Sequence, residues 1–229
     1  MDIPLSGIAN IDPLLDTAIL STDGELNQTE SYSAAQVLEK LEVAWMNEKM
    51  CPELLEHHME FVDAMLEQLN ELKVMIFQAT SKADIRVSSH LMEMDRIRYI
   101  IADYIRCRIR KIEEFAQMIV SSTAEQTKLT SAELDFVTGY WASIKCHLAE
   151  SAGKNMPENV RKINTDKIVV KPEYYKYVFV KAVKTETGVV VSEPGDLEEE
   201  IIDLDTNDQQ LVPYKSIDHL LTSGAVRLI

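Results

Sequence analysis

Between Ser33 and Gly153, apolar residues recur every three or four positions, which is the spacing of one face of an α-helix. The first stripe follows Ser33 and consists of Ala34, Leu38, Leu41 and Trp45. A second, longer stripe follows Pro52, a residue suited to the first position of a helix. It consists of Leu55, His58, Val62, Met65, Leu69, Leu72 and Ile76. The pattern therefore predicts two helices, the second beginning at Pro52.

Two further helices are predicted before Gly153. The third runs from about Asp84 to Val120, and a loop rich in Ser, Thr and Gln follows it. Thr130 and Glu133 then have the spacing of a capping box, in which each residue satisfies a backbone N–H of the other. The stripe of this fourth helix consists of Leu134, Val137, Trp141, Ile144 and Leu148. We expect Gly153 to end it.

From residue 167 the chain changes from helical spacing to short runs rich in Val, Ile and Tyr, separated by turn residues. These runs predict strands at 167–171, 174–183, 187–191, 199–205, 209–214 and 225–229. A short helix from Ser216 to Leu221, stopped by Gly224, precedes the last strand. A β-rich region of this size is marginally stable by itself, so we expect it to lean on a neighbour.

The predicted fold class is α+β, with an N-terminal bundle of about four long helices followed by a small β-rich domain. We divide the chain into an acidic, disordered tail (1–30), a helical domain (31–152), a linker (153–166) and the β-rich domain (167–229).

The tail carries six acidic residues and no basic one, within a chain of formal net charge -15. It has one candidate element, because Asp12 can cap a helix that begins at Pro13. The apolar residues of this element are Ile11, Leu14, Leu15 and Ile19. It is either a chance cluster or a linear motif that folds on a partner.

The segment 95–114 contains five arginines that divide between two faces of the third helix. Arg96, Arg106 and Arg110 project from the polar face, where acidic residues outnumber them. Arg98 and Arg108 fall within the apolar face formed by Ile97, Ile100, Ile101, Tyr104, Ile105, Ile109, Ile112 and Phe115.

An arginine within an apolar face is costly unless its guanidinium meets a carboxylate or backbone carbonyls. We therefore interpret Arg98 and Arg108 as buried or interfacial ion-pair residues. The alternative is a nucleic-acid-binding module that uses the basic helix 86–111, although such a module favours unopposed positive charge on one face. The helix is long and its apolar face wide, so we expect a second chain to cover part of it.

The motifs of common catalytic sites do not occur in the sequence. With seven dispersed glycines, neither a P-loop nor G-x-G-x-x-G can be written, and H-E-x-x-H and G-x-S-x-G do not occur either. Glu53 and His57 share a helical spacing, but no second pair accompanies them as a di-metal site would need. We expect no enzyme activity, no cofactor and no metal.

The expected location is the cytosol or the nucleus. The longest apolar runs are far too short to span a membrane, and the first 20 residues lack Lys and Arg. Cys51, Cys107 and Cys146 are widely spaced and odd in number, which favours free thiols in a reducing compartment. We interpret all three as small core residues.

Several segments resemble the GINS complex of the eukaryotic replicative helicase, most closely its subunit of the Sld-five type. The two most specific are MEMDRIRYIIADYIRCRIRKIE and YKSIDHLLTSGAVRLI; the others are AWMNEKMCPELLE, NMPENV, YVFV and IIDL. The order of the domains agrees, because two subunits of that family place the helical domain before the β domain.

The resemblance implies a non-catalytic scaffold in a heterotetramer, with three sister GINS subunits as partners. That complex joins the MCM ring and a RecJ-like partner to form the active (CMG) helicase at replication forks in the nucleus, so DNA contact is at most indirect. The tail is a possible contact for a replisome hub protein. We predict the partner-interface residues Trp45, Arg96, Arg98, Tyr99, Tyr104, Arg106 and Arg108.

Overall fold

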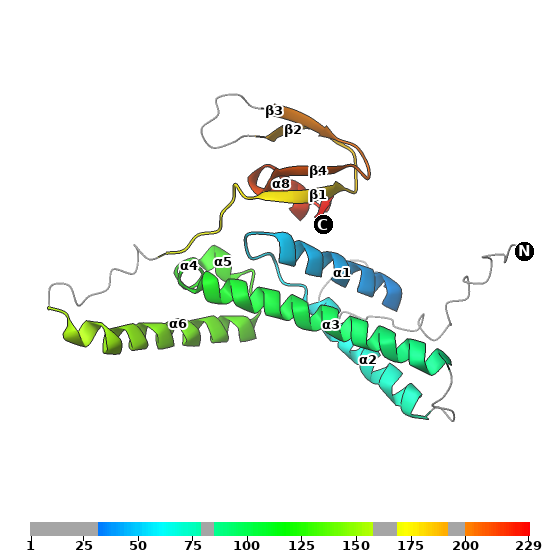
Figure 1. Ribbon diagram of the computed structural model, residues 1–229, viewed down its shortest axis with the longest axis horizontal. Coiled ribbons are helices and arrows are strands. Elements are labelled where there is room, and N and C mark those ends of the chain that lie inside the picture. The colour runs from blue at the N-terminus through cyan, green and yellow to red at the C-terminus, as the bar shows by residue number, and fades with distance from the viewer. Residues whose placement is uncertain (1–31, 79–84, 158–168, 192–199) are drawn as a thin grey trace, which may run out of the picture. The chain divides into compact units, whose positions relative to one another are not determined.

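In the computed structural model a series of helices comes first along the chain, and strands follow with one further helix among them (Figure 1). The structure describes residues 32–78, 85–157, 169–191 and 200–229. The tail, with its possible linear motif, and most of the predicted linker lie outside these residues. The division into domains stays a prediction.

Four helices are long: α1 (Ala34–Met50), α2 (Met59–Gln78), α3 (Ile85–Glu114) and α6 (Ser131–Ser151). The chain between α3 and α6 forms the short helices α4 (Ala116–Ser121) and α5 (Thr123–Gln126), and a 3-10 turn, η1 (Gly153–Asn155), follows α6. The predicted capping box is present, because the Glu133 N–H donates to Thr130 Oγ1 and the Thr130 N–H donates to Glu133 Oε2. None of the described helices contains the long, nearly uncharged apolar stretch that a membrane span needs.

The β-rich region contains two small antiparallel sheets. In the first, β1 (Tyr177–Ala182) lies between β4 (Gln209–Pro213) and β5 (Val226–Leu228). In the second, β2 (Glu186–Val191) pairs with β3 (Glu200–Leu204). The helix α8 (Tyr214–Thr222) follows β4, and Gly224 adopts a φ of 70°, which favours glycine. The α+β fold class is confirmed.

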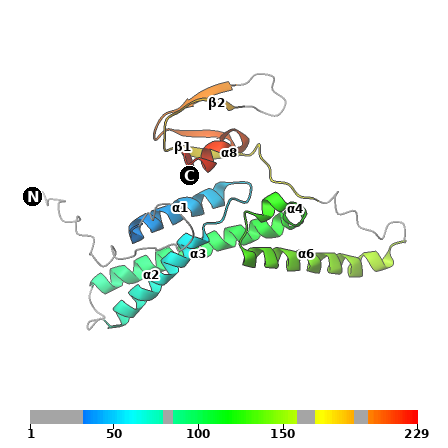
Figure 2. The ribbon, with the colours of Figure 1, turned by 180° about the vertical axis from the view of Figure 1, so that it is seen from behind.

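The described residues form two compact units. The first contains 32–45, 58–78 and 85–102, and the second contains 46–57, 103–157, 169–191 and 200–229. Figure 2, which views the ribbon from behind, shows α1 and α3 as continuous helices. Residues of each of these helices belong to both units.

The predicted start of the second helix was wrong. Residues 51–58 are not helical, and α2 begins at Met59. The reason lies in their backbone hydrogen bonds: the Leu55 carbonyl accepts from Arg108 Nη1 and the Glu53 carbonyl accepts from Lys111 Nζ. A helix would bond these carbonyls to its own N–H groups, so charged side chains of α3 hold the segment in a loop.

Two other predicted elements also differ. The third helix does not run unbroken to Val120, because it ends at Glu114 and Phe115 takes a φ of -98° and a ψ of 15°. The turn lets α4 place Ala116 and Ile119 in a core with Leu129 and Val137. Of the strand predicted at 167–171, residues 169–171 are not a strand, and 167–168 lie outside the described residues.

The core of the β-rich region includes a residue of the 51–58 loop. Val178, Val180 and Ala182 alternate inward along β1 and pack with Ile217 of α8 and with Cys51. The Leu228 N–H donates to Asn47 Oδ1, and the Tyr214 hydroxyl donates to Glu53 Oε1. These contacts join the β-rich region to the C-terminal end of α1, which is the neighbour that its small size requires.

The interpretation of all three cysteines as core residues was wrong for Cys146, which is exposed, and Cys107 is only partly buried. We therefore expect their reactivities to differ. Cys51 is 4% exposed, and burial raises the pKa of its thiol to about 11, whereas Cys146 is exposed on α6. Because the thiolate is the reacting species, we expect native Cys51 to react with N-ethylmaleimide at least about a hundredfold more slowly than Cys146. Peptide mass spectrometry measures both rates, and in urea they should converge. Similar native rates would show that the 51–58 loop is not packed in this core.

Candidate interface site

Arg108 of α3 is 0% exposed, and all five of its N–H donors have acceptors. Its Nε and Nη2 bind the two carboxylate oxygens of Glu133 at 2.8 and 3.1 Å. Nη1 donates to Glu48 Oε2 at 3.2 Å and to the Leu55 carbonyl at 2.9 Å, and Nη2 also donates to the Lys128 carbonyl at 3.1 Å. One guanidinium thus ties α1, the 51–58 loop and the start of α6 to α3.

Lys111, one turn further along α3, shares a carboxylate with Arg108. Its Nζ donates to Glu48 Oε1 at 2.8 Å, and to the backbone carbonyls of Glu48 and Glu53. Glu48 is 1% exposed. The Arg108 cluster, which we define as Arg108, Lys111, Glu48 and Glu133, therefore holds two positive and two negative side chains, and this balance makes their burial tolerable.

The pKa directions in the cluster follow from its hydrogen bonds. Burial by itself lowers the pKa of the Arg108 guanidinium. The hydrogen bonds from Arg108 to Glu133 and the negative charges of Glu48 and Glu133 have the larger, opposite effect, so the pKa lies above its ordinary value. Burial raises the pKa of the Glu133 carboxyl, but the hydrogen bonds from Arg108 outweigh burial and lower it. Both groups are therefore charged at neutral pH.

The sequence predicted Arg108 as a buried or interfacial ion-pair residue, and a buried ion pair is present. Its partners were missed. Glu133 was assigned only its capping role, whereas it caps α6 and binds Arg108 at once. Glu48 could have been found, because it continues the stripe of Ala34 and Leu41 at helical spacing, and a lone acid there needs a buried cation.

Arg98 differs from Arg108. Its Nη1 donates to Asp95 Oδ1 at 3.0 Å, and about half of its side chain is exposed, so the described part of this chain does not bury it. The polar-face residue Arg96 pairs with Glu93 and Glu42, and these hydrogen bonds raise its pKa. Arg106 and Arg110 are exposed.

The remaining predicted interface residues lie in two environments. Trp45 and Tyr99 form an edge-to-face pair with ring centroids 6.3 Å apart, and Tyr99 is more than half exposed. Tyr104 is buried, and the Arg108 guanidinium carbon lies 5.9 Å from its ring centroid. An interface role for all seven residues stays a prediction, but Tyr104 and Arg108 leave almost no surface for a partner to touch.

Three of the five arginines in 95–114 disfavour the nucleic-acid alternative. Arg96 and Arg98 each pair with a carboxylate, and Arg108 is enclosed. A phosphate backbone is attracted to unopposed cations, and these three supply none.

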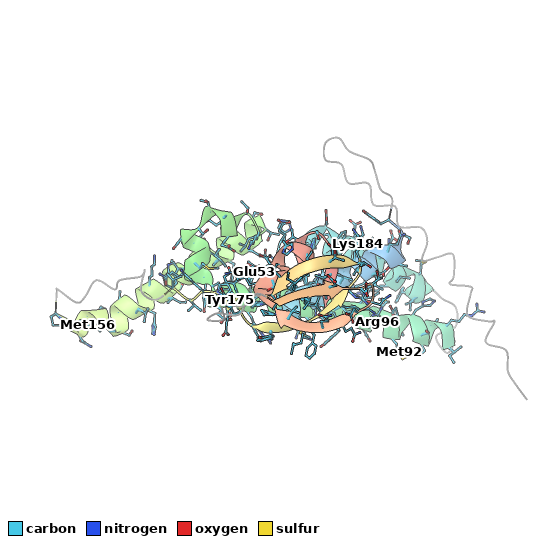
Figure 3. The ribbon with its side chains drawn as sticks, turned by 90° about the horizontal axis from the view of Figure 1, so that it is seen from above. Glu53, Met92, Arg96, Met156, Tyr175 and Lys184 are labelled. Carbon is cyan, nitrogen blue, oxygen red and sulfur yellow. The ribbon has the colours of Figure 1, made fainter. Side chains whose placement is uncertain are left out.

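Large apolar side chains remain exposed on α6. Only Val137 of this helix is buried, and the stacked pair Phe136 and Tyr140 and the later Leu148 are open to solvent to different degrees. Figures 1 and 2 show that α6 begins beside α4 and α5 and that its C-terminal half extends away from them, toward Met156 in Figure 3. We define the α6 face as Trp141, Ile144 and Leu148, and none of the described elements of its unit buries it.

A second set of exposed apolar residues lies on the N-terminal half of α3. Ile85, Leu91 and Met92 expose from 45% to 83% of their surface, and Figure 3 labels Met92 on the same helix as Arg96. Such residues are rarely grouped on the surface of a soluble monomer, and grouped patches are typical of protein interfaces.

Within the described residues, no three His, Cys, Asp or Glu side chains are grouped as a metal site requires. Glu53, which was paired with His57 in the sequence, instead accepts from Tyr214 and Lys128. It is a structural contact of the 51–58 loop.

Comparison with known proteins identifies the fold. Residues 53–152 match the model of the GINS complex protein helical bundle domain, and residues 172–229 match that of the DNA replication complex GINS protein SLD5 C-terminus. The chain is similar to the SLD5 protein of Mus musculus, with 40% identity over 85% of this chain and 90% of that protein. The Homo sapiens protein is 38% identical over the same shares, and that of Schizosaccharomyces pombe is 29% identical over 83% and 91%.

A helical bundle followed by a small β-rich domain, matched by both family models, defines a GINS complex protein of DNA replication. Within that class, the chain belongs to the SLD5 family.

We expect Arg108→Ala to lower the free energy of unfolding by about 3–5 kcal/mol, because it leaves Glu48 and Glu133 without their main buried cation. Arg108→Lys should lose less, since it keeps the charge but not the two-point contact with Glu133. The matched control Arg110→Ala, on the exposed face, should change stability by less than about 0.5 kcal/mol. Urea denaturation followed by circular dichroism measures all three. Equal losses for Arg108→Ala and Arg110→Ala would contradict the role of the cluster.

The lowered pKa of Glu133 predicts a loss of stability in acid. A carboxyl whose pKa is depressed by folding stabilises the protein above its unfolded pKa, about 4.3, and that contribution is lost as the pH falls through the folded value. We expect Glu133→Gln to destabilise the chain by about 1–3 kcal/mol at pH 7. The difference from the native protein should shrink below about pH 4. A difference that is constant from pH 7 to 3 would argue against the ion pair.

Proposed function

We propose that the chain is a non-catalytic scaffold subunit of the heterotetrameric GINS complex, with three sister GINS subunits as its direct partners. In this proposal the complex joins the MCM ring and a RecJ-like partner to form the active replicative helicase in the nucleus. Contact with DNA is at most indirect, and the tail is a possible site for a replisome hub protein. Membership of the SLD5 family supports the assignment.

The observation that carries the scaffold role is the uncovered α6 face. The Trp141 and Ile144 side chains are partly exposed and Leu148 is 36% exposed, on a helix of 21 residues that buries only Val137. A helix with so little packing gains its stability mainly by burying an amphipathic face, so this stripe favours a partner helix. The exposed residues of α3 add to the apolar surface available for assembly.

The Arg108 cluster suits a scaffold because it stiffens the base from which α6 projects. Arg108 holds Glu133 in the first turn of α6, and the capping box holds the start of the same helix. A helix anchored at one end presents its apolar face in a defined direction. Binding to a preorganised face costs less ordering entropy than binding to a mobile one.

The test is co-expression with the three sister subunits followed by mass measurement of the intact assembly. Leu148→Asp places a charge on the α6 face, and we expect it to reduce the yield of heterotetramer at least about tenfold, because the carboxylate would be buried without a partner. The matched control Ala142→Asp adds the same charge to an exposed residue on the opposite side of α6 and should assemble normally.

Circular dichroism of the two variant chains provides the folding control. Similar helix content in both, with assembly lost only for Leu148→Asp, supports the proposal. Normal assembly of Leu148→Asp would exclude the α6 face, and failure of the unaltered chain to join any sister subunit would overturn the scaffold role.

A further inference from the structure

A cleft of about 410 Å³ lies between β2 and α8 in the β-rich region, and neither the Arg108 cluster nor the α6 face uses it. Its lining on β2 is the unbroken run Glu186–Val190, and its lining on α8 is Lys215, Ser216, His219 and Leu220. The α8 residues share one helix face. The volume falls in the range of binding pockets for peptides and small molecules.

The β2 wall of the cleft is the free edge of a strand. Among the described strands, β2 pairs only with β3, so its other edge offers backbone N–H and C=O groups to an added strand. Five consecutive residues of β2 line the cleft, as expected when the edge of a strand, rather than one of its faces, borders the space. The register of the β2–β3 pairing shifts between Glu186 and Val189, where Gly188 takes a φ of 76°.

Successive apolar residues of β2 face opposite sides of the strand, so each side offers contacts to alternate side chains of an added strand. Val189 and Leu220 are almost fully buried and form an apolar floor. Val190, the next residue, is 43% exposed and pairs in register with Ile201, which is 68% exposed. An extended peptide on this edge would place alternate side chains against the floor and beside the Val190–Ile201 pair.

The α8 wall of the cleft supplies Lys215 and His219, and the β2 wall supplies one carboxylate, that of Glu186. Lys215 is exposed, and its Nζ donates to the Tyr175 hydroxyl at 2.8 Å, but no carboxylate of the described residues lies within ion-pair distance of it. His219 lies one turn further along the same face. Lys215 can therefore pair with a carboxylate of a bound segment.

We propose that this cleft binds an extended segment of a partner protein by strand addition to β2. The segment has alternating aliphatic residues, which cover the Val189–Leu220 floor and extend the Val190–Ile201 pair, and an acidic side chain that meets Lys215 and His219. Main-chain hydrogen bonds supply affinity, and the alternate side chains and the acid supply specificity. The inference does not depend on the scaffold role, since it concerns neither the α6 face nor the Arg108 cluster.

The probe is a display library of random 12-residue peptides selected on the immobilised full chain. We expect enriched peptides to combine alternating aliphatic residues with an acid. A synthetic copy of an enriched peptide, titrated by fluorescence anisotropy, should bind the Lys215→Glu, His219→Glu double variant at least about tenfold more weakly. The control variant Lys154→Glu, an exposed lysine of η1, should bind as the native chain does.

Strand addition has its own readout. Amide NMR shifts should be confined to β2 and α8, and a proline in the centre of the peptide should abolish binding, because proline cannot donate to the strand pairing. No enrichment, equal binding by the double variant, or shifts elsewhere would overturn the proposal. A synthetic peptide of residues 1–30 is the last arm: if it occupies the cleft with the affinity of the selected peptides, the occupant is the chain's own tail and the partner assignment is wrong.

Discussion

The five hydrogen bonds of the Arg108 guanidinium are the constraint on which the helical part of the second unit depends. A buried guanidinium must satisfy every donor and meet compensating charge, and Glu48, Glu133 and two backbone carbonyls do so. Those acceptors come from α1, the 51–58 loop and the chain at the start of α6. The hydrogen bonds of one side chain therefore position three segments. The 51–58 loop is non-helical for the same reason, since its carbonyls bind α3 side chains.

The 51–58 loop also connects the helices to the β-rich region. Cys51 packs in the core of that region, Glu53 accepts from the Tyr214 hydroxyl, and Asn47 accepts from the Leu228 N–H. The Glu53 carbonyl at the same time accepts from Lys111, which belongs to the Arg108 cluster. A sheet of this size is marginally stable by itself, so these contacts give it a fixed support. Damage to the cluster would therefore reach the β-rich region through a single short loop.

Three surfaces outside the Arg108 cluster remain available to partners. The α6 face and the exposed apolar residues of α3 are helical and suited to partner helices, whereas the β2 edge is suited to an extended segment. The two kinds of surface belong to different parts of the chain. The assembly through helices and the strand addition to β2 that we propose would therefore not compete for the same surface.

The sequence by itself determined the main helices and strands, the α+β order, the capping box at Thr130 and Glu133, and the position of Arg108 on the apolar face of its helix, because periodicity and local capping depend on residues close in the chain. It also predicted a family resemblance that the comparisons confirm. Only the tertiary structure decided where α2 begins, that α3 ends at Glu114, and that Arg98 stays at the surface while Arg108 is enclosed by Glu48 and Glu133. The enclosure of Arg108 depends on Glu133 and Glu48, which lie 25 and 60 residues away in the chain, and spacing along one helix carries no information about such contacts.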